Sequence, residues 1–308
     1  MATGLTEQKT TLPQAGARAG AAQARRRGRR KPAGFYIQRG FQYLVMIILS
    51  AIFMIPLVWI ISSSLKTQGQ VFAYPPVWIP NPIVWYNYIE ALQRAPLLRW
   101  LWNTSVITFF AIVGNVLTSS MVAFGFARLR FPGRGPLFIL LLSTMMLPPV
   151  VTLIPRFIMF RWVGWLDTFL PMIIPPFFGG GAFNIFLVRQ FYLTIPRDFD
   201  EAARIDGASN WAIWRLILAP LSKPVLIAIG IFSFVFHWND FMNPLIFLFS
   251  EKNKTLALGL RAFINPSDAS WHISMAASMY LVIPIIVLFF VGQRYFIRGV
   301  VMTGIQGR

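Results

Sequence analysis

The 308-residue sequence contains no cysteine and only two histidines, His237 and His272. The absence of cysteine excludes disulfides, thiolate metal sites and cysteine nucleophiles. Two isolated histidines are too few for a histidine metal cluster. Charged residues are also scarce, at 12% against about 25% in an average soluble domain. Because so few charges would leave large apolar patches on a water-soluble surface, the composition indicates a membrane protein.

Hydrophobic residues make up 56% of the chain and gather in long runs. A helix that crosses the hydrocarbon layer needs about 20 mostly apolar residues. Six stretches meet this requirement, so we expect an all-α membrane protein with six transmembrane helices. Their approximate bounds are residues 41–61, 104–126, 137–160, 168–188, 218–241 and 273–292.

Proline and glycine interrupt several of these stretches, as in Pro148-Pro149, Pro175-Pro176 and Gly179-Gly180-Gly181. Membrane helices tolerate such breaks where the freed backbone groups face protein or a water-lined cavity. Two interpretations are open: the breaks line a pathway between helices, or they only reflect close packing in the bundle.

The net charge of +18 is concentrated near the N-terminus. Residues 1–34 have few large apolar side chains, and we expect them to form a disordered cytoplasmic tail. Its basic run, residues 25–31, is typical either of a nucleic-acid patch or of an anchor that contacts anionic lipid. The run ends ten residues before the apolar stretch that begins at Phe41. This position favours a lipid-contacting anchor, and we expect no nucleic-acid partner. That stretch is too long for a signal peptide and should remain as a spanning helix.

Lysine and arginine are unevenly distributed between the connecting segments. With the N-terminus in the cytoplasm, 20 of the 28 basic residues lie on the cytoplasmic side, counting Lys223 at the mouth of the fifth helix, and 9 of these are in the first 40 residues. This bias follows the positive-inside rule and places both termini in the cytoplasm. The cytoplasmic segments are then 1–40, 127–136, 189–217 and 293–308.

Four of the ten acidic residues fall within nine positions of the loop 189–217. The spacing of Asp198 and Glu201 predicts a helix N-cap with its reciprocal partner. Gly207 suits the left-handed position that ends a helix, and Ser209 can cap a second helix that enters the membrane.

On this short helix, Phe199, Ala202, Ala203 and Asp206 are expected to share one face. An interfacial helix resting on lipid is the alternative, but such helices usually carry Lys and Arg on the polar face. Small residues beside one aromatic side chain favour docking into a groove of another protein.

The string Glu201-Ala202-Ala203, followed by three residues and Gly207, resembles the EAA loop of ABC importer permeases. From about residue 35 onward the chain is similar to the carbohydrate-uptake subfamily, and in particular to the smaller permease subunit of maltose-type transporters. Other strings that carry the resemblance are Asn103-Thr104-Ser105, Ala127 to Arg134, Met145 to Pro149, Leu166-Asp167-Thr168, Arg189-Gln190-Phe191, Leu218 to Pro224, Trp238 to Phe241 and Gln293 to Gly299.

The resemblance implies a type I ABC importer permease fold in a bacterial or archaeal inner membrane. In this family a second homologous permease completes a heterodimer, joined by two ATP-binding cassette ATPases and an extracytoplasmic solute-binding protein. ATP and Mg would be bound by the ATPases, because this chain contains no G-x-x-x-x-G-K-[ST] string. We therefore expect a permease for a sugar or sugar-like solute that is not itself an enzyme and binds no cofactor.

The family's EAA helix seats in a cleft of the ATPase and relays its closure to the spans. The coupling residues expected here are Phe199, Glu201, Ala202, Ala203, Asp206, Gly207 and Ala208. The C-terminal residues 299–308 either reach the ATPases, as family tails can, or are simply solvated.

Outside the membrane, aromatic residues in 62–102 indicate an interfacial belt or contact with the binding protein. The loop from Leu245 to Ile273, with Arg261, Asn265 and Asp268, resembles the family loop that reaches toward the binding protein's ligand cleft.

For the substrate path, Trp238, Asn239 and Asp240 are candidates. An aromatic face can stack on a sugar, a carboxamide can bond hydroxyl groups, and an intramembrane carboxylate indicates function. The alternative for Asp240 is a wetted or helix-capping position at the outer interface.

Two other classes of membrane protein fit the sequence less well. A membrane-embedded enzyme would need a motif such as H-E-x-x-H, a Ser/His pair or paired acids within a span, and only Asp240 lies well inside one. An ion-coupled secondary transporter or channel would need buried titratable groups or inverted repeats, and no clear internal repeat is present. This class also leaves the acidic helix of the loop unexplained.

Overall fold

The computed structural model describes residues 33–264 and 270–304, and every regular element within them is helical. In chain order these elements are α2 (Ala33–Ser64), α3 (Gln68–Val71), α4 (Tyr86–Arg94), α5 (Leu97–Arg128), α6 (Arg134–Ser143), η1 (Thr144–Met146), α7 (Leu153–Trp162), α8 (Leu170–Ile173), η2 (Pro175–Phe177), α9 (Ala182–Thr194), α10 (Asp198–Ile205), α11 (Asn210–Ala212), η3 (Ile213–Leu218), α12 (Ala219–Leu221), α13 (Lys223–Trp238), α14 (Met242–Phe247), η4 (Glu251–Asn253), α15 (Leu256–Gly259), η5 (Leu260–Phe263) and α16 (Trp271–Gly304). Of the η elements, η3 is a π-helix and the others are 3₁₀-helices.

The chain divides into two compact units, residues 1–58 and 59–308. The first unit contains most of α2, and the sequence's predicted tail lies almost entirely outside the described residues. Its last two positions are an exception, because Ala33 and Gly34 already belong to α2. The predicted C-terminal segment 299–308 is described only as far as the end of α16.

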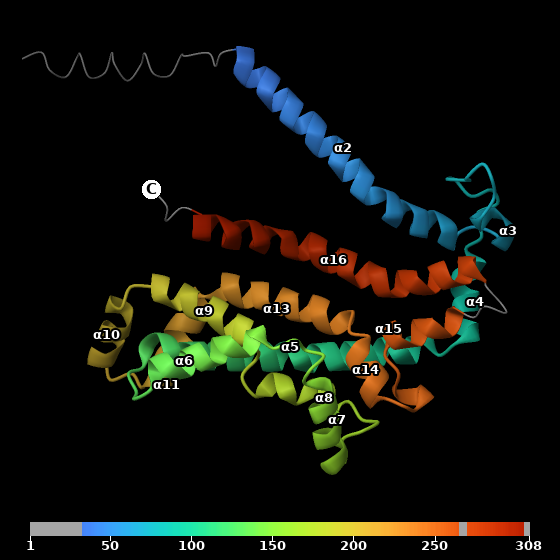
Figure 1. The fold of residues 1–308 in the computed structure, drawn as a ribbon. Coiled ribbons are helices and arrows are strands. Elements are labelled where there is room, and N and C mark those ends of the chain that lie inside the picture. The colour runs from blue at the N-terminus through green and yellow to red at the C-terminus, as the bar shows by residue number, and fades with distance from the viewer. Residues whose placement is uncertain (1–32, 265–269, 305–308) are drawn as a thin grey trace, which may run out of the picture. The chain divides into compact units, whose positions relative to one another are not determined.

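Within the second unit, α5 is the central helix and packs against α9 and α13, while α16 packs on α13 and α4. Figure 1 shows α10 and α11 at one end of this bundle and α4, α14 and α15 at the other. Buried apolar side chains form one cluster at the α10 end, which includes Ile185, Tyr192 and Leu218, and another at the α4 end around Trp100. The two ends of the bundle therefore have separate cores.

Four segments are long and apolar enough to cross a membrane: Gly34–Ser64, Leu97–Arg128, Leu170–Thr194 and Trp271–Gln293. A fifth is counted if Asn210–Leu221 and Lys223–Trp238, which meet at an angle of 79°, form one bent span. The structure therefore confirms an all-helical chain with several candidate spans, whereas six continuous spanning helices are not seen in the described residues.

The predicted span at 137–160 has no counterpart among these segments, because the helix is interrupted there. Its first half is an apolar helix over Arg134–Met146, and its second half lies in α7. Leu147 takes an extended conformation, with φ −76° and ψ 119°, immediately before Pro148-Pro149. A residue that precedes proline avoids the helical region, so the sequence ends the helix at this point.

The break at residues 174–181 is packed against α5. Thr118 donates from Oγ1 to the carbonyl oxygen of Pro176 at 2.9 Å, and Asn184 donates from Nδ2 to that of Gly180 at 2.7 Å. Gly180 has a φ of 66°, and a Cβ there would lie 2.6 Å from the carbonyl oxygen of Asn115. These contacts satisfy carbonyl groups that the break frees, so for this segment they support the packing interpretation.

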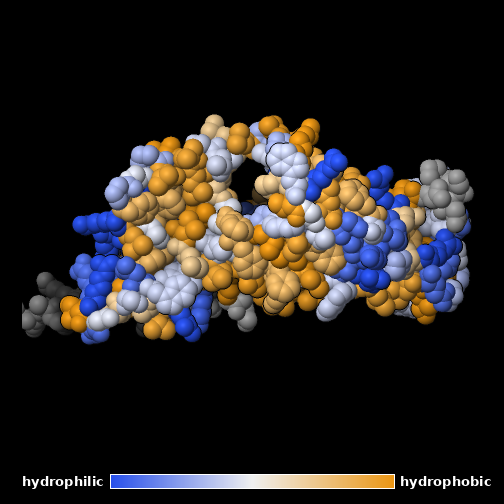
Figure 2. Space-filling view, turned by 90° about the horizontal axis from the view of Figure 1, so that it is seen from below, coloured by the Kyte–Doolittle hydropathy of each residue, from blue (hydrophilic) through white to orange (hydrophobic). Residues whose placement is uncertain are grey.

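The surface is apolar over much of its area. Figure 2 shows one face, on which hydrophobic residues cover most of the middle and hydrophilic residues gather toward both ends. Side chains such as Phe109, Leu140 and Phe290 are more than two-fifths exposed. Large exposed apolar areas of this kind fit a protein surrounded by lipid or by other subunits.

Candidate functional site

The helix α10 carries most of the acidic cluster of the loop 189–217. It begins one residue earlier than the predicted cap requires: Arg197 is the N-cap residue, it makes no side-chain cap hydrogen bond, and Asp198 is the first helical residue. The predicted Asp198–Glu201 capping box is therefore wrong. Asp198, Asp200 and Glu201 instead place three carboxylates in the first turn, where the positive end of the helix dipole stabilises negative charge.

The end of α10 agrees with the sequence prediction. Gly207 has a φ of 80°, and its backbone N–H donates to the carbonyl oxygen of Arg204 at 3.0 Å. The N–H of Ala208 donates to the carbonyl oxygen of Ala203 at 2.9 Å. Ser209 then caps the next helix by accepting a hydrogen bond from the N–H of Ala212. This turn fixes the direction in which the chain leaves α10.

The faces of α10 differ from those predicted. Ala203 is buried in the chain's own core, whereas Phe199, Ala202 and Asp206 are exposed. The four residues therefore do not form one free docking face. The inward face of α10 consists of Ala203 and of Asp200, three residues earlier, which are both buried. Glu201 and Gly207 are exposed, and Ala208 is half-exposed.

Asp200 forms a buried ion pair with Arg128, the last residue of α5. Arg128 Nε lies 2.8 Å from Asp200 Oδ2, and the two side chains are only 3% and 9% exposed. Arg128 also donates from Nη2 to the carbonyl oxygen of Ile195 at 2.8 Å. Removing one member of a buried pair leaves an uncompensated charge and typically costs about 3–5 kcal/mol. The pair therefore ties α10 to the central helix of the bundle.

This pair was not predicted from the sequence. The only signal there is a single arginine at the end of a long apolar stretch and several acidic residues on a short helix, one of which could be its partner. Side-chain spacing within α10 could not identify the partner, because Arg128 and Asp200 are 72 residues apart.

A polar network lies behind α10 and links three further helices. Ser120 of α5 and Tyr192 of α9 are joined through their hydroxyl groups at 2.7 Å, and Trp214 of η3 donates from Nε1 to Ser120 Oγ at 3.0 Å. All three residues are buried. Satisfied buried networks hold their members in one arrangement, so η3 is fixed to the same helices as α10.

The chain does not continue straight from α10 into the membrane. It passes through α11, η3 and α12 and then bends by 79° into α13. The bend falls at Ser222, which is fully buried. A displacement of α10 would therefore be transmitted to α13 through the bend at Ser222 and to α5 through the Arg128–Asp200 ion pair.

The candidate substrate-path residues lie at the opposite end of α13. Trp238 is 4% exposed, donates from Nε1 to the carbonyl oxygen of Leu281 at 2.9 Å and stacks on Phe234. Its ring is thus enclosed by the chain itself. Asp240 accepts hydrogen bonds from the backbone N–H and Nδ2 of Asn243, which agrees with the helix-capping alternative. Asn239 is exposed and donates to the carbonyl oxygen of Val235.

The outer loops at this end are fastened by side chains from the spans. Asp167, with a φ of 57°, accepts hydrogen bonds from the backbone N–H groups of Phe249 and Ser250 and from the Ser250 hydroxyl. The Ser250 side chain is the main cause that lowers the pKa of Asp167 to about 2. Asn103 of α5 donates to the carbonyl oxygens of Lys252 and Lys254, both at 2.9 Å.

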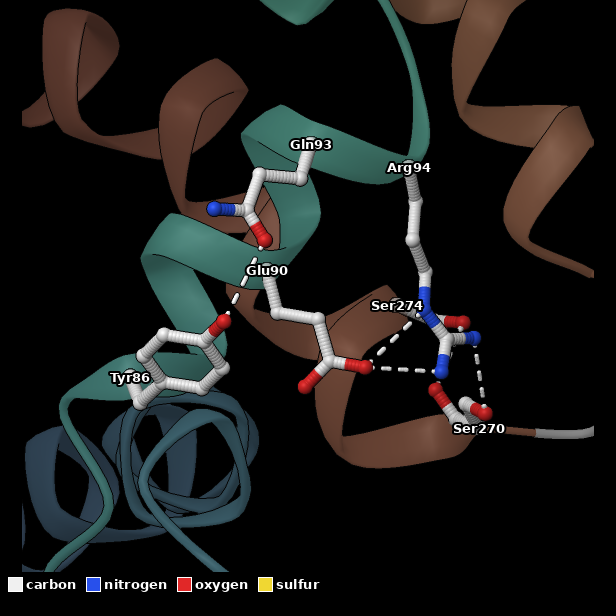
Figure 3. Close-up of polar contacts among 6 residues, drawn as sticks. All are labelled: Tyr86, Glu90, Gln93, Arg94, Ser270 and Ser274. Carbon is white, nitrogen blue, oxygen red and sulfur yellow. Dashed lines mark hydrogen bonds and ion pairs between the residues drawn. The ribbon is translucent and has the colours of Figure 1, made fainter.

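A second set of contacts joins α4 to the start of α16, as Figure 3 shows. Arg94 pairs with Glu90 at 2.8 Å and donates from Nη1 to Ser270 Oγ at 3.0 Å. Tyr280 donates from its hydroxyl group to the carbonyl oxygen of Tyr88 at 3.2 Å. In the predicted binding-protein loop, Arg261 is exposed, and Asn265 and Asp268 lie outside the described residues.

Comparison with known proteins gives consistent matches. Residues 115–302 match the family described as binding-protein-dependent transport system inner membrane component. The chain is 33% identical over 270 residues to the sn-glycerol-3-phosphate transport system permease protein UgpE of Brucella abortus, covering 85% of this chain and 95% of that protein. It is 30% identical over 283 residues to the maltose/maltodextrin transport system permease protein MalG of Escherichia coli K12, covering 86% and 95%.

The fold also matches solved structures. A bacterial ABC transporter involved in the import of the acidic polysaccharide alginate contains a chain that matches with a TM-score of 0.76 and 25% identity, covering 87% of this chain and 99% of that chain. A chain from a bacterial alginate ABC transporter in complex with an alginate-bound periplasmic protein matches with a TM-score of 0.63. At 13% identity, the second match supports the fold alone.

Proposed function

The chain belongs to the family of binding-protein-dependent transport system inner membrane components and is a permease subunit of an ABC importer, and from this premise we propose its assembly and its solute. In the proposal it forms one half of the translocation pathway, with a second homologous permease, two ATPase subunits and an extracytoplasmic solute-binding protein. The solute is a carbohydrate or a sugar-like molecule such as a glycerol phosphate. Transport of sn-glycerol-3-phosphate by one of the two relatives and of maltose or maltodextrin by the other supports this class.

Within this assembly, α10 is the proposed contact with the ATPase subunits, which bind ATP and Mg and hydrolyse the nucleotide. The observation that carries the proposal is the arrangement of α10 itself. It is fixed inward by Ala203 and the buried Arg128–Asp200 pair, yet it leaves Phe199 half exposed and Ile205 87% exposed. Exposed apolar side chains on a helix that is held rigid from behind suit a groove on another protein.

We further propose that the chain crosses the membrane six times. The sixth crossing would be the interrupted segment that comprises α6, η1 and α7, packed within the complete assembly. Both termini and α10 would face the cytoplasm, as the distribution of basic residues indicates.

Co-expression tests the assembly directly. The permease, its second permease and the ATPase would be purified by a tag on this chain and reconstituted with the binding protein. ATPase co-purification and ATP-dependent uptake are expected, and uptake that survives ATP depletion would favour an ion-coupled transporter instead. A ligand screen on the binding protein would identify the solute class.

The α10 contact is tested by substituting Ala202→Trp, because Ala202 is exposed and a bulky ring there should block a close groove. Ala203→Trp would not serve as this test, because Ala203 is buried and that change would also disturb the permease itself. We expect Ala202→Trp to abolish ATPase co-purification while the permease stays in the membrane. Normal co-purification and uptake in this variant would refute the proposed role of α10.

A further inference from the structure

A pocket of about 710 Å³ opens beside α10, between this helix and the chain that follows α5. Its lining is unusual because it is dominated by guanidinium groups. The arginines are Arg128, Arg130, Arg197 and Arg204, and the two carboxylates are Asp200 and Glu201.

The positive charge of this pocket is only partly compensated within the chain. Arg128 is neutralised by Asp200 in the buried pair, which leaves three arginines against Glu201. Arg197 lies near enough to Arg128 for their charges to repel each other. Arg204 approaches Asn210 Oδ1 at 3.4 Å, which supplies no charge. An anion in the pocket would relieve this repulsion.

The guanidinium groups that line the pocket favour a phosphate group as the anion. Planar guanidinium groups bind phosphate oxygens in a bidentate manner and are favoured wherever phosphate is recognised. Leu129 and Phe131, which also line the pocket, add an apolar wall, and Phe131 is 37% exposed. Arg128 is the last residue of the apolar α5, so the pocket opens at the level where a spanning helix reaches the membrane surface.

We propose that this pocket binds a phosphate-bearing anion at the cytoplasmic membrane surface, supplied either by the headgroup of an anionic phospholipid or by free phosphate. The cytoplasmic leaflet is rich in anionic headgroups and attracts clustered basic side chains. The proposal rests on the cytoplasmic orientation of α10 from the proposed function, but it does not depend on ATPase docking.

The test uses the intact transporter with Arg130→Gln and Arg197→Gln combined in this subunit. Both side chains are exposed, and neither substitution touches the buried pair or removes the backbone groups that start α10. Arg215→Gln is the matched control, because Arg215 is exposed on η3 but does not line the pocket. If the double variant fails to assemble, the single Arg130→Gln variant replaces it, since Arg130 lies outside every helix.

Two binding measurements separate the sources of phosphate. Phosphatidylglycerol retained by the complex would be counted by native mass spectrometry after exchange into detergent, and binding of inorganic phosphate would be measured by titration calorimetry. Removing two charged hydrogen-bond donors should weaken binding of the true ligand by about tenfold or more, while Arg215→Gln leaves it unchanged. An effect on phosphatidylglycerol alone identifies a lipid site, and an effect on both probes identifies a site open to free phosphate.

Equal binding of both probes by wild type, double variant and control would overturn the proposal. In that outcome the pocket's arginines serve another purpose, such as contact with an acidic surface of the ATPase. ATPase co-purification, measured in the same samples, separates ATPase docking from phosphate binding. Loss of co-purification in Ala202→Trp alone tests the docking role of α10. A change in phosphate or lipid binding without loss of co-purification tests the pocket.

Discussion

The two ends of the second unit are built differently. At the α4 end, outer loops are fastened by many side chains from the spans, including Asn103, Asp167 and the fully buried Trp100. At the α10 end, one short helix is held by a single buried ion pair and one small apolar residue, Ala203. The difference indicates that the first end works as a scaffold, whereas the second presents a surface that is complete only with a partner.

The largest effect is expected from filling the closest contact of the α4 end. A Cβ added at Gly259 would overlap the ring of Trp100, which is fully buried. Because this ring has no room to move, Gly259→Val should destabilise the chain by about 3 kcal/mol or more. A large drop in the melting temperature of Gly259→Val in detergent would confirm this destabilisation. Gly69→Val is the control for backbone effects, because Gly69 is also a helical glycine but has open space around it. A melting temperature of Gly259→Val near that of wild type would show that the Trp100 contact does not hold this end together.

Breaking the ion pair should have the next largest effect. Asp200→Asn leaves Arg128 buried without its charge partner and should destabilise α10 by about 3 kcal/mol. We expect faster hydrogen exchange over residues 198–208 and less transport per ATP hydrolysed. Asp198→Asn is the matched control, since Asp198 is exposed in the same helical turn.

A paired replacement sharpens this prediction. Arg128→Met with Asp200→Leu removes both charges, and well-packed apolar substitutes for a buried pair are often neutral in stability. Hydrogen exchange should therefore return toward the wild-type rate. Equal exchange in Asp200→Asn and Asp198→Asn would contradict the structural role of the pair.

A smaller effect is expected from the turn that ends α10. Gly207 has a φ of 80°, a conformation in which a β-branched residue is strained by about 1–2 kcal/mol. Gly207→Val should redirect the chain and uncouple transport while the protein stays in the membrane, and Gly207→Asn should do so less. Uptake assays on reconstituted protein measure the difference, and unchanged coupling in the valine variant would show that this turn does not transmit motion.

The smallest effect concerns Asp167 at the α4 end. Its hydrogen bonds lower the pKa from 3.8 to about 2, so the charged carboxylate stabilises the fold above the unfolded pKa. Asp167→Asn should lower stability at neutral pH by about 1 kcal/mol. The difference from wild type should shrink as the pH falls from about 4 to about 2, because the wild-type carboxylate then becomes protonated. A pH-independent difference in melting temperature would contradict this assignment.

The sequence predicted the helical class and the apolar stretches, because hydrophobic length alone separates a spanning helix from a soluble one. It also predicted the turn at Gly207 and the cap at Ser209, which depend on local backbone chemistry. Its count of six continuous spans was not confirmed, because Pro148-Pro149 splits one stretch and a bend of 79° interrupts another. For the aromatic residues in 62–102 it left an interfacial belt and a binding-protein contact open, and Trp100 fits neither, since this ring is buried in the core.

Local information therefore determined where helices can form and which residues are too apolar for water. The tertiary structure alone decided which side chains face inward: Ala203 and Trp238 are buried, and Arg128 meets Asp200 across 72 residues of chain. Helical periodicity orders residues around one helix, but a buried charge is stable only where folding brings its partner within a few ångströms. The pairing of Arg128 with Asp200 depends on how α5 and α10 pack together. The spacing of residues within either helix does not predict that packing.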